Sequence, residues 1–264
     1  MANRDVLYEK EGNLAIITLN RPERLNSFAM GTMERMVDAV EDAGRDTKVR
    51  AIIVTGAGDR GFCTGADVNM LAANIEAGQR RYTAEHVARR DFALHIYDVE
   101  KPTFAAVNGA AVGAGFGLSL AFDFRIASEK ARFSSMFVRR GVAPHAGVSW
   151  HLPRIVGYSK ALELMLTGDL IDAQEALRIG LVSKVVPPEK LMEATKEMAT
   201  RIVEGPVITQ TLIKRQLRRS VLTNNLEIQI DFENYQHDLT LRTDEHKEGV
   251  RAFLEKREPQ FKGG

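Results

Sequence analysis

The residues best suited to chemistry in this sequence lie in two glycine-rich stretches. The first holds Gly56, Gly58 and Gly61 in the pattern G-x-G-x-x-G, directly after the apolar run at 51–55. In a dinucleotide-binding fold, such glycines open a helix whose N-terminus holds a pyrophosphate. Here the sequence FCTG at 62–65 is not typical of an amphipathic helix, and no clear second strand ends in an acidic residue about 20 positions later. An NAD-dependent oxidoreductase is therefore an alternative that rests on spacing alone.

The second stretch is NGAAVGAGFGLSL at 108–120, in which Gly and Ala fill nearly every position from 109 to 117. Small side chains let a ligand approach backbone N–H groups, and a helix that starts within the stretch adds the positive potential of its N-terminus. Close packing of a helix on a strand favours the same residues. The stretch therefore indicates either a ligand-binding loop or a tight helix–strand contact.

Short apolar runs alternate with helical periodicity along the first part of the chain, which predicts an α/β architecture. Strands are expected at 6–9, 13–20, 51–55 and 103–107, and helices at 33–44, in the second half of 69–99 and within 109–122. From 149 onward the sequence is mostly helical, with its clearest break at 186–188. The run from 206 to 254 predicts three consecutive amphipathic helices, a kind of tail that often packs against a core or a neighbouring subunit.

Length, composition and charge exclude several classes of protein. The chain has 264 residues, 44% of them hydrophobic, and 36 basic residues against 35 acidic ones give a net charge of +1. That balance gives no general argument for a nucleic-acid or membrane surface. The single cysteine, Cys63, excludes an internal disulfide and a multi-cysteine metal site. No apolar run approaches the roughly 20 residues that cross a bilayer, and the first residues lack an apolar signal core, so a cytoplasmic protein is expected.

Several longer segments occur in an order that is more specific than any one of them. They are GFCTGADV (61–68), KPTFAAVNG through EKARF (101–133), GVAPHAGVSWHLPRIVG (141–157), the opening RPERLNS and the closing EGVRAFLEKREPQF. Together they resemble the crotonase, or enoyl-CoA hydratase/isomerase, superfamily. The resemblance implies an α/β fold, a crotonase-like spiral of β-β-α units at 1–200 with a helical C-terminal oligomerisation region at 201–264. It also implies a homotrimer or a hexamer.

The resemblance implies chemistry on an acyl-CoA thioester whose carbonyl oxygen becomes negative as an enolate forms. Two backbone N–H groups stabilise that oxygen in the family, and the matching positions are Ala66 in FCTGADV and Ala114 in VGAGFG. Implied contacts to coenzyme A come from Arg24, Leu25, Thr64, Asp67, Val68, Phe253 and Lys256. Coenzyme A is then part of the substrate in fatty acid metabolism. No separate cofactor, metal ion, nucleic acid or membrane is expected.

The sequence departs from the family pattern at the positions of two catalytic glutamates. Hydratases of the family use them to add water across a double bond, and the matching residues here are Gly117 and Phe137. Neither can transfer a proton, so the ordinary hydratase mechanism cannot run with these side chains. Some isomerases and dehalogenases that lack the first glutamate place an aspartate where this chain has His145. A histidine can act as a general base near neutral pH, which favours isomerase-type proton transfer over dehalogenation.

Other interpretations remain open on the sequence. A catalytically silent relative that binds acyl-CoA without transforming it would also fit the missing carboxylates. The segment 76–95 borders the acyl pocket in the family, but a surface role is expected for each of its polar groups, Glu76, Tyr82, Glu85, His86 and His95. Cys63 is expected to be a small buried thiol and not a nucleophile.

Overall fold

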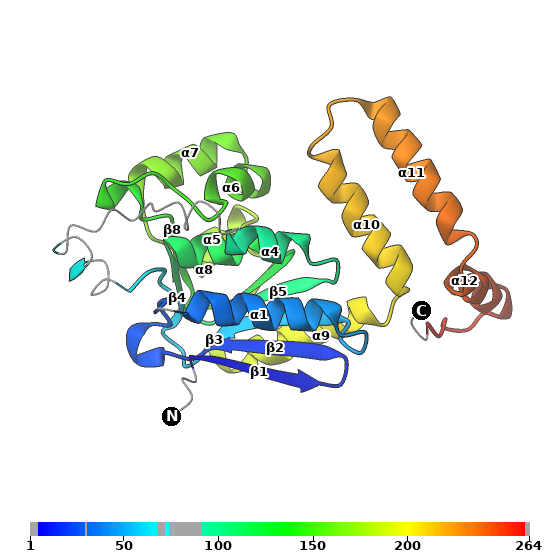
Figure 1. Cartoon of the computed structure of the whole chain (residues 1–264), viewed down its shortest axis with the longest axis horizontal. Helices are drawn as coiled ribbons and strands as arrows, with labels where there is room; N and C mark the ends of the chain where they lie inside the picture. Colours follow the sequence, from blue (N-terminus) through cyan, green and yellow to red (C-terminus); the bar gives the residue numbers. More distant parts are fainter. Residues whose placement is uncertain (1–4, 30, 68–71, 74–75, 77–90, 262–264) are drawn as a thin grey trace. The chain divides into compact units, whose positions relative to one another are not determined.

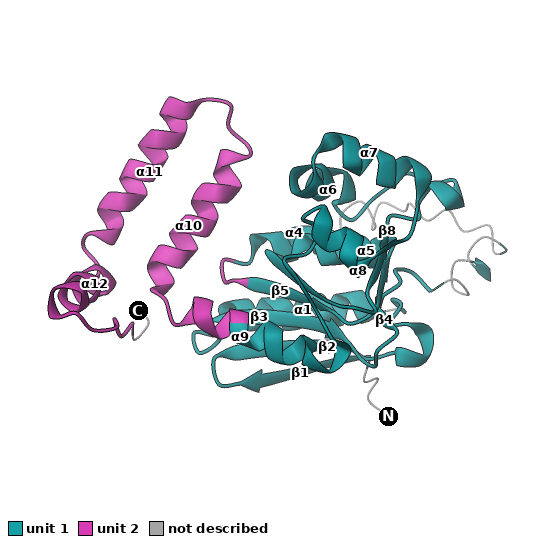
Figure 2. Cartoon of the chain, turned by 180° about the vertical axis from the view of Figure 1, so that it is seen from behind, with its two compact units in different colours: residues 1–99, 103–197 teal, residues 100–102, 198–264 magenta. Residues whose placement is uncertain are grey.

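The computed structural model describes residues 5–29, 31–67, 72–73, 76 and 91–261. The chain divides into two units, coloured separately in Figure 2. Unit 1 consists of residues 1–99 and 103–197, and unit 2 consists of residues 100–102 and 198–264. The division falls within helix α9 (Leu191–Val203).

Unit 1 is built on two sheets of unequal size (Figure 1). The larger sheet has the strand order β1 (Val6–Glu11), β2 (Leu14–Leu19), β3 (Ala51–Gly56), β5 (Thr103–Val107), β7 (Phe124–Ser128) and β10 (Lys184–Val186). β1 and β2 form an antiparallel hairpin, and the other strands add in parallel. The smaller sheet has the order β4 (Gly61–Cys63), β6 (Ala110–Val112), β8 (Arg132–Ser134) and β9 (Ile171–Asp172).

The chain advances through both sheets together. β3, β5 and β7 are neighbours in the larger sheet, and each is followed by β4, β6 or β8, which are neighbours in the smaller one. Each turn of the chain therefore adds one strand to each sheet. This is the α/β crotonase-like spiral of β-β-α units that the resemblance implies. The sequence does not predict the short strands, because three residues are too few to form a recognisable pattern.

Strands β2, β3 and β5, inside the larger sheet, are apolar and almost entirely buried. Every residue of β3 and β5 is buried, which is typical of parallel strands covered on both faces. Met36 and Val40 of helix α1 (Thr32–Arg45) join the same hydrophobic core as Ile17 of β2. The strands expected at 13–20, 51–55 and 103–107 are thus confirmed. In the part of unit 1 that the structure describes, further helices are α4 (Phe92–Asp98), α5 (Ala114–Ala121), α6 (Val148–Val156), α7 (Tyr158–Thr167) and α8 (Ala173–Arg178).

Unit 2 contains the predicted helical tail. Its helices α10 (Val207–Ser220), α11 (Leu226–Thr240) and α12 (Asp244–Glu255) confirm the three amphipathic helices expected at 206–254. The buried carboxylate of Glu245 in α12 accepts hydrogen bonds from the N–H groups of Ile208 and Thr209, at 3.2 and 3.4 Å, and so caps the start of α10. Across the described residues, no helix combines the length and apolar character that a membrane crossing requires.

Candidate active site

The two glycine-rich stretches meet at one edge of the smaller sheet. β4 ends at Cys63 and its parallel neighbour β6 ends at Val112, with Cys63 opposite Ala111. Because parallel strands have their carboxyl ends at the same edge, the loops that follow them start side by side. A β-carbon at Gly65 would lie 3.0 Å from the amide nitrogen of Ala114. The fold therefore brings together the two loops that carry Ala66 and Ala114.

Phe28 holds the backbone on either side of Ala66. The N–H of Phe28 donates to the carbonyl of Gly65 at 2.7 Å, and the N–H of Asp67 donates to the carbonyl of Phe28 at 3.2 Å. These two bonds form a parallel bridge between Phe28 and Ala66. The groups bonded to Phe28 are the carbonyl of Gly65 and the N–H of Asp67, and not those of Ala66 itself. In an extended segment, successive N–H groups point in opposite directions, so the N–H of Ala66 faces away from Phe28.

The amide of Ala114 belongs to the first residue of helix α5. The N–H groups of a first helical turn have no carbonyl four residues earlier within the helix to bind, and they lie at the positive end of the helix dipole. Residues 114–121 of α5 are all buried, which explains why small side chains fill the start of this helix. The small residues that allow this close packing therefore also place the Ala114 N–H at the start of the helix.

His145 lies in the loop before α6, where its exposed imidazole contacts Phe137. The two rings are 5.2 Å apart between centroids and meet edge-on at 66°. The next residue, Ala146, is buried and has a left-handed φ of 57°. A β-carbon at Gly117 of α5 would lie 2.7 Å from both the β-carbon and the carbonyl oxygen of Ala146. The loop therefore fills the space at Gly117, and the three positions singled out from the sequence lie close together.

Replacing Gly117 by alanine should destabilise the protein by about 1–3 kcal/mol, because the new methyl group must push the Ala146 backbone away. Gly44→Ala is a matched control in helix α1, since no atom lies within 4 Å of a β-carbon built there. This control should be neutral or stabilising, as alanine is favoured over glycine in helices by up to about 1 kcal/mol. Urea unfolding of both variants measures the difference. An unchanged free energy of unfolding for Gly117→Ala would contradict the close contact with Ala146.

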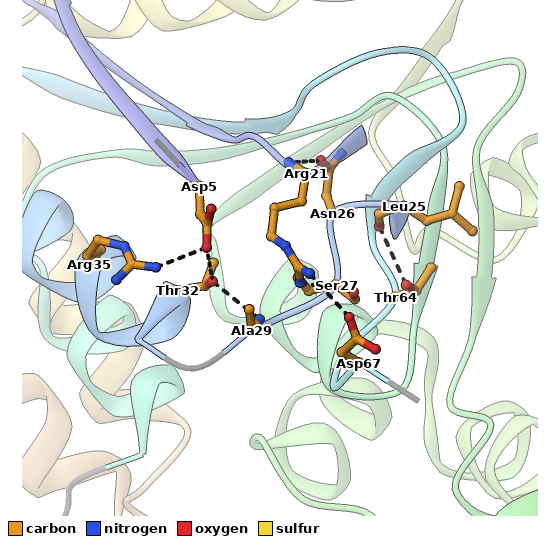
Figure 3. Close-up of polar contacts among 10 residues, drawn as sticks. All are labelled: Asp5, Arg21, Leu25, Asn26, Ser27, Ala29, Thr32, Arg35, Thr64 and Asp67. Carbon is orange, nitrogen blue, oxygen red and sulfur yellow. Dashed lines mark hydrogen bonds and ion pairs between the residues drawn. The ribbon is translucent and has the colours of Figure 1, made fainter. Parts of the chain in front are cut away.

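The residues expected to bind coenzyme A fall into both units. In unit 1, Arg24 is exposed, and the backbone carbonyl of Leu25 accepts the hydroxyl of Thr64 at 3.5 Å (Figure 3). The carboxylate of Asp67 pairs with Arg21, and Val68 lies outside the described residues. In unit 2, the side chain of Phe253 is 83% exposed, and Lys256 is exposed with a left-handed φ of 54°.

Two buried asparagines support the loop after β3, and the sequence interpretation missed them. The side-chain amides of Asn26 and Asn108 both donate to the carbonyl of Gly61, at 2.6 and 2.9 Å. Asn108 also accepts the N–H of Gly56 at 3.1 Å. A polar residue directly after the apolar strand at 103–107 is the signal that could have identified Asn108. These bonds fix the turn from β3 into β4. Gly61 begins strand β4, whereas a dinucleotide-binding site would need a helix there.

Among the other ionisable candidates, Cys63 is buried and His95 is hydrogen-bonded to a residue of α1. Burial raises the pKa of the Cys63 thiol to about 12, so this side chain stays protonated and is a poor nucleophile. Nδ1 of His95 lies 2.7 Å from a carboxylate oxygen of Glu41 on α1, and this hydrogen bond lowers the pKa of Glu41. Glu76 is exposed, whereas Tyr82, Glu85 and His86 lie outside the described residues. Within the described ranges, no group of three or more His, Cys, Asp or Glu could hold a metal ion.

Comparison with known proteins assigns the family. The family model for enoyl-CoA hydratase/isomerase matches residues 9–264. The chain belongs to the enoyl-CoA hydratase/isomerase family. Within that family, crotonyl-CoA hydratase of Syntrophomonas wolfei subsp. wolfei is 38% identical over 261 residues, covering 99% of each chain. The 1,2-epoxyphenylacetyl-CoA isomerase of Escherichia coli K12 is 36% identical over 261 residues, covering 98% of each. A crystal structure of an enoyl-CoA hydratase subunit I from Geobacillus kaustophilus HTA426 superposes with a TM-score of 0.88, at 36% identity and 98% coverage of each chain.

Membership of the enoyl-CoA hydratase/isomerase family confirms the resemblance found in the motifs. The protein is an enzyme of a family that acts on CoA thioesters. Its relatives include both hydratases and isomerases at nearly equal identity. Overall similarity therefore does not choose between the two reactions, and the choice depends on the residues at the site.

Proposed function

We propose that this enzyme isomerises an enoyl-CoA thioester through an enolate held by the amides of Ala66 and Ala114. His145 acts as the general base that removes a proton from the carbon next to the thioester carbonyl. The C–H electron pair forms a carbon–carbon double bond, and the carbonyl π electrons move onto the oxygen. Reprotonation two carbons further along returns the proton and moves the double bond. The reaction consumes no water, oxidant or reductant.

The observation that carries the proposal is the occupied space around Gly117. Hydration needs groups that deliver a hydroxide to one carbon and a proton to the next. Positions 117 and 137 hold a glycine and a phenylalanine, and Ala146 packs directly on Gly117. A single base that can give back the proton it removed is sufficient for isomerisation. His145, beside Phe137, is such a group.

The proposed enolate site uses the two loops at the edge of the smaller sheet. Charge that develops on an oxygen is best stabilised by donors that are already oriented before the reaction. The close approach of the Gly65 backbone to the nitrogen of Ala114, together with the bridge between Phe28 and Ala66, supports such a preformed arrangement. No separate cofactor enters the proposed reaction, because coenzyme A is part of the substrate.

We propose that Arg24, Leu25, Thr64, Asp67 and Val68 contact coenzyme A from unit 1, and Phe253 and Lys256 from unit 2. We further propose a homotrimer or hexamer in which the region at 201–264 makes subunit contacts. Large apolar side chains of unit 2 support this role, since Leu226, Phe253 and Leu254 are between 73% and 83% exposed. Exposed apolar residues in such numbers mark interaction sites on soluble proteins.

Incubation of the purified protein with 2-enoyl- and 3-enoyl-CoA thioesters in deuterated water tests the proposed reaction. We expect interconversion of the two double-bond positions, with deuterium entering the carbons that exchange protons and no 3-hydroxyacyl product. NMR of the products distinguishes these outcomes. Accumulation of a 3-hydroxyacyl thioester would instead indicate hydration. Binding of coenzyme A thioesters without turnover of any of them would favour the catalytically silent relative.

A further inference from the structure

Arg21 connects the end of strand β2 to the loop that carries Ala66. Its guanidinium donates to the backbone carbonyl of Ser27 at 2.7 Å and to the carboxylate of Asp67 at 3.2 Å (Figure 3). The side chains of Arg21 and Asp67 are only 17% and 15% exposed. An ion pair that is mostly shielded from water is held more tightly than one at the surface.

The Ser27 carbonyl and the Asp67 carboxylate, which Arg21 binds, lie on either side of the Phe28–Ala66 bridge along the chain direction. Ser27 directly precedes Phe28, and Asp67 directly follows Ala66. Two main-chain hydrogen bonds already join these segments. The N–H of Phe28 donates to the carbonyl of Gly65, and the N–H of Asp67 donates to the carbonyl of Phe28. The guanidinium adds a side-chain connection between Ser27 and Asp67, which reinforces these main-chain bonds next to Ala66.

We propose that Arg21 is a positioning residue, which orients the Ala66 amide by holding Ser27 and Asp67 together. The proposal rests on the function proposed above, in which that amide binds the enolate oxygen. An amide stabilises a developing charge only if its N–H points at the oxygen, and small displacements at a site are costly in rate. Arginine suits this task because its planar group presents several donors in fixed directions, which a lysine ammonium does not.

The test compares Arg21→Met and Arg21→Lys with a matched control. Arg35→Met removes another arginine–aspartate pair at the same end of unit 1, where the guanidinium of Arg35 lies 3.0 Å from the carboxylate of Asp5 (Figure 3). Thermal unfolding of all three variants measures how much stability each one loses. Steady-state kinetics on an enoyl-CoA thioester then separates effects on kcat from effects on KM.

Infrared difference spectra of bound butyryl-CoA, labelled with ¹³C at the thioester carbonyl, report the hydrogen bonds to that oxygen directly. In the unaltered protein we expect the carbonyl band to lie at lower wavenumber than in free butyryl-CoA. Both Arg21 variants should lose a large part of this shift and about 10- to 100-fold in kcat. KM should rise as well, because Arg21 also holds Asp67, a proposed coenzyme A contact. Arg35→Met should keep both the band position and kcat.

If Arg35→Met and Arg21→Met lose equal amounts of kcat and of the band shift, the proposal is wrong, and Arg21 has only a general structural role. An unaltered band and kcat in Arg21→Lys would likewise overturn the proposal, and this milder variant provides the comparison if Arg21→Met does not fold. If the unaltered protein itself gives no band shift with bound butyryl-CoA, the proposed enolate site fails instead. That result is distinguishable because it does not depend on any variant.

Discussion

A proline at position 114 is expected to lower kcat for isomerisation by about 100- to 1,000-fold, which is typical for the loss of one oxyanion donor. Proline lacks the backbone N–H, so Ala114→Pro deletes the proposed donor itself. The substitution is compatible with the fold, since Ala114 is the first residue of α5 and proline is favoured at that position of a helix. Steady-state kinetics and circular dichroism measure the loss of rate and the retention of helix.

Ala114→Gly is the control for this variant, because it also changes the side chain but keeps the amide. It should retain kcat within a few-fold, although glycine at a helix start lowers stability by up to about 1 kcal/mol. If Ala114→Pro folds and turns over substrate as fast as Ala114→Gly, the amide of Ala114 does not stabilise the enolate. The proposed pair of donors would then be wrong.

Much of the fold could be predicted because its long elements have simple patterns. The runs at 51–55 and 103–107 are continuous apolar segments, and these become the fully buried strands β3 and β5. The heptad-like spacing of apolar residues at 33–44 becomes the buried face of α1. The three-residue strands β4, β6 and β8 have no such pattern, yet they set the edge at which the two loops meet. Only the family resemblance places them.

The sequence could predict which residues belong to the site, but not the contacts that the tertiary fold makes between them. Ala66 and Ala114 follow from short motifs, and their loops are in contact in the structure. The contact between Gly117 and Ala146 could not be predicted, because it depends on how a loop 29 positions away along the chain (146 − 117 = 29) packs onto α5. In the sequence, Arg21 is only the first residue of the RPERLNS segment that contributes to the family resemblance. Its partners, Ser27 and Asp67, are brought to it by the tertiary fold, and the distances between these residues along the sequence do not reveal the contacts.

These contacts give a physical reason why, in the proposed reaction, the base comes from the loop before α6 and not from positions 117 and 137. A larger residue at 117 would require the Ala146 backbone to move, and that backbone is continuous with His145. Phe137 in turn supports the imidazole by an edge-on contact. Glycine at 117 and phenylalanine at 137 therefore both favour the observed position of His145.

Removal of the imidazole is expected to have the largest effect of any single side-chain change. His145→Ala should lower kcat by about 100- to 10,000-fold, the usual contribution of a positioned general base, and should abolish deuterium exchange into the substrate. Because His145 is exposed, added imidazole should restore part of the rate. His145→Asp should also retain more activity than His145→Ala, since a carboxylate can carry the proton. Titration with butyryl-CoA should give similar affinities for all three proteins. A His145→Ala variant with the original kcat would assign the proton transfer to another group while leaving the enolate site in place.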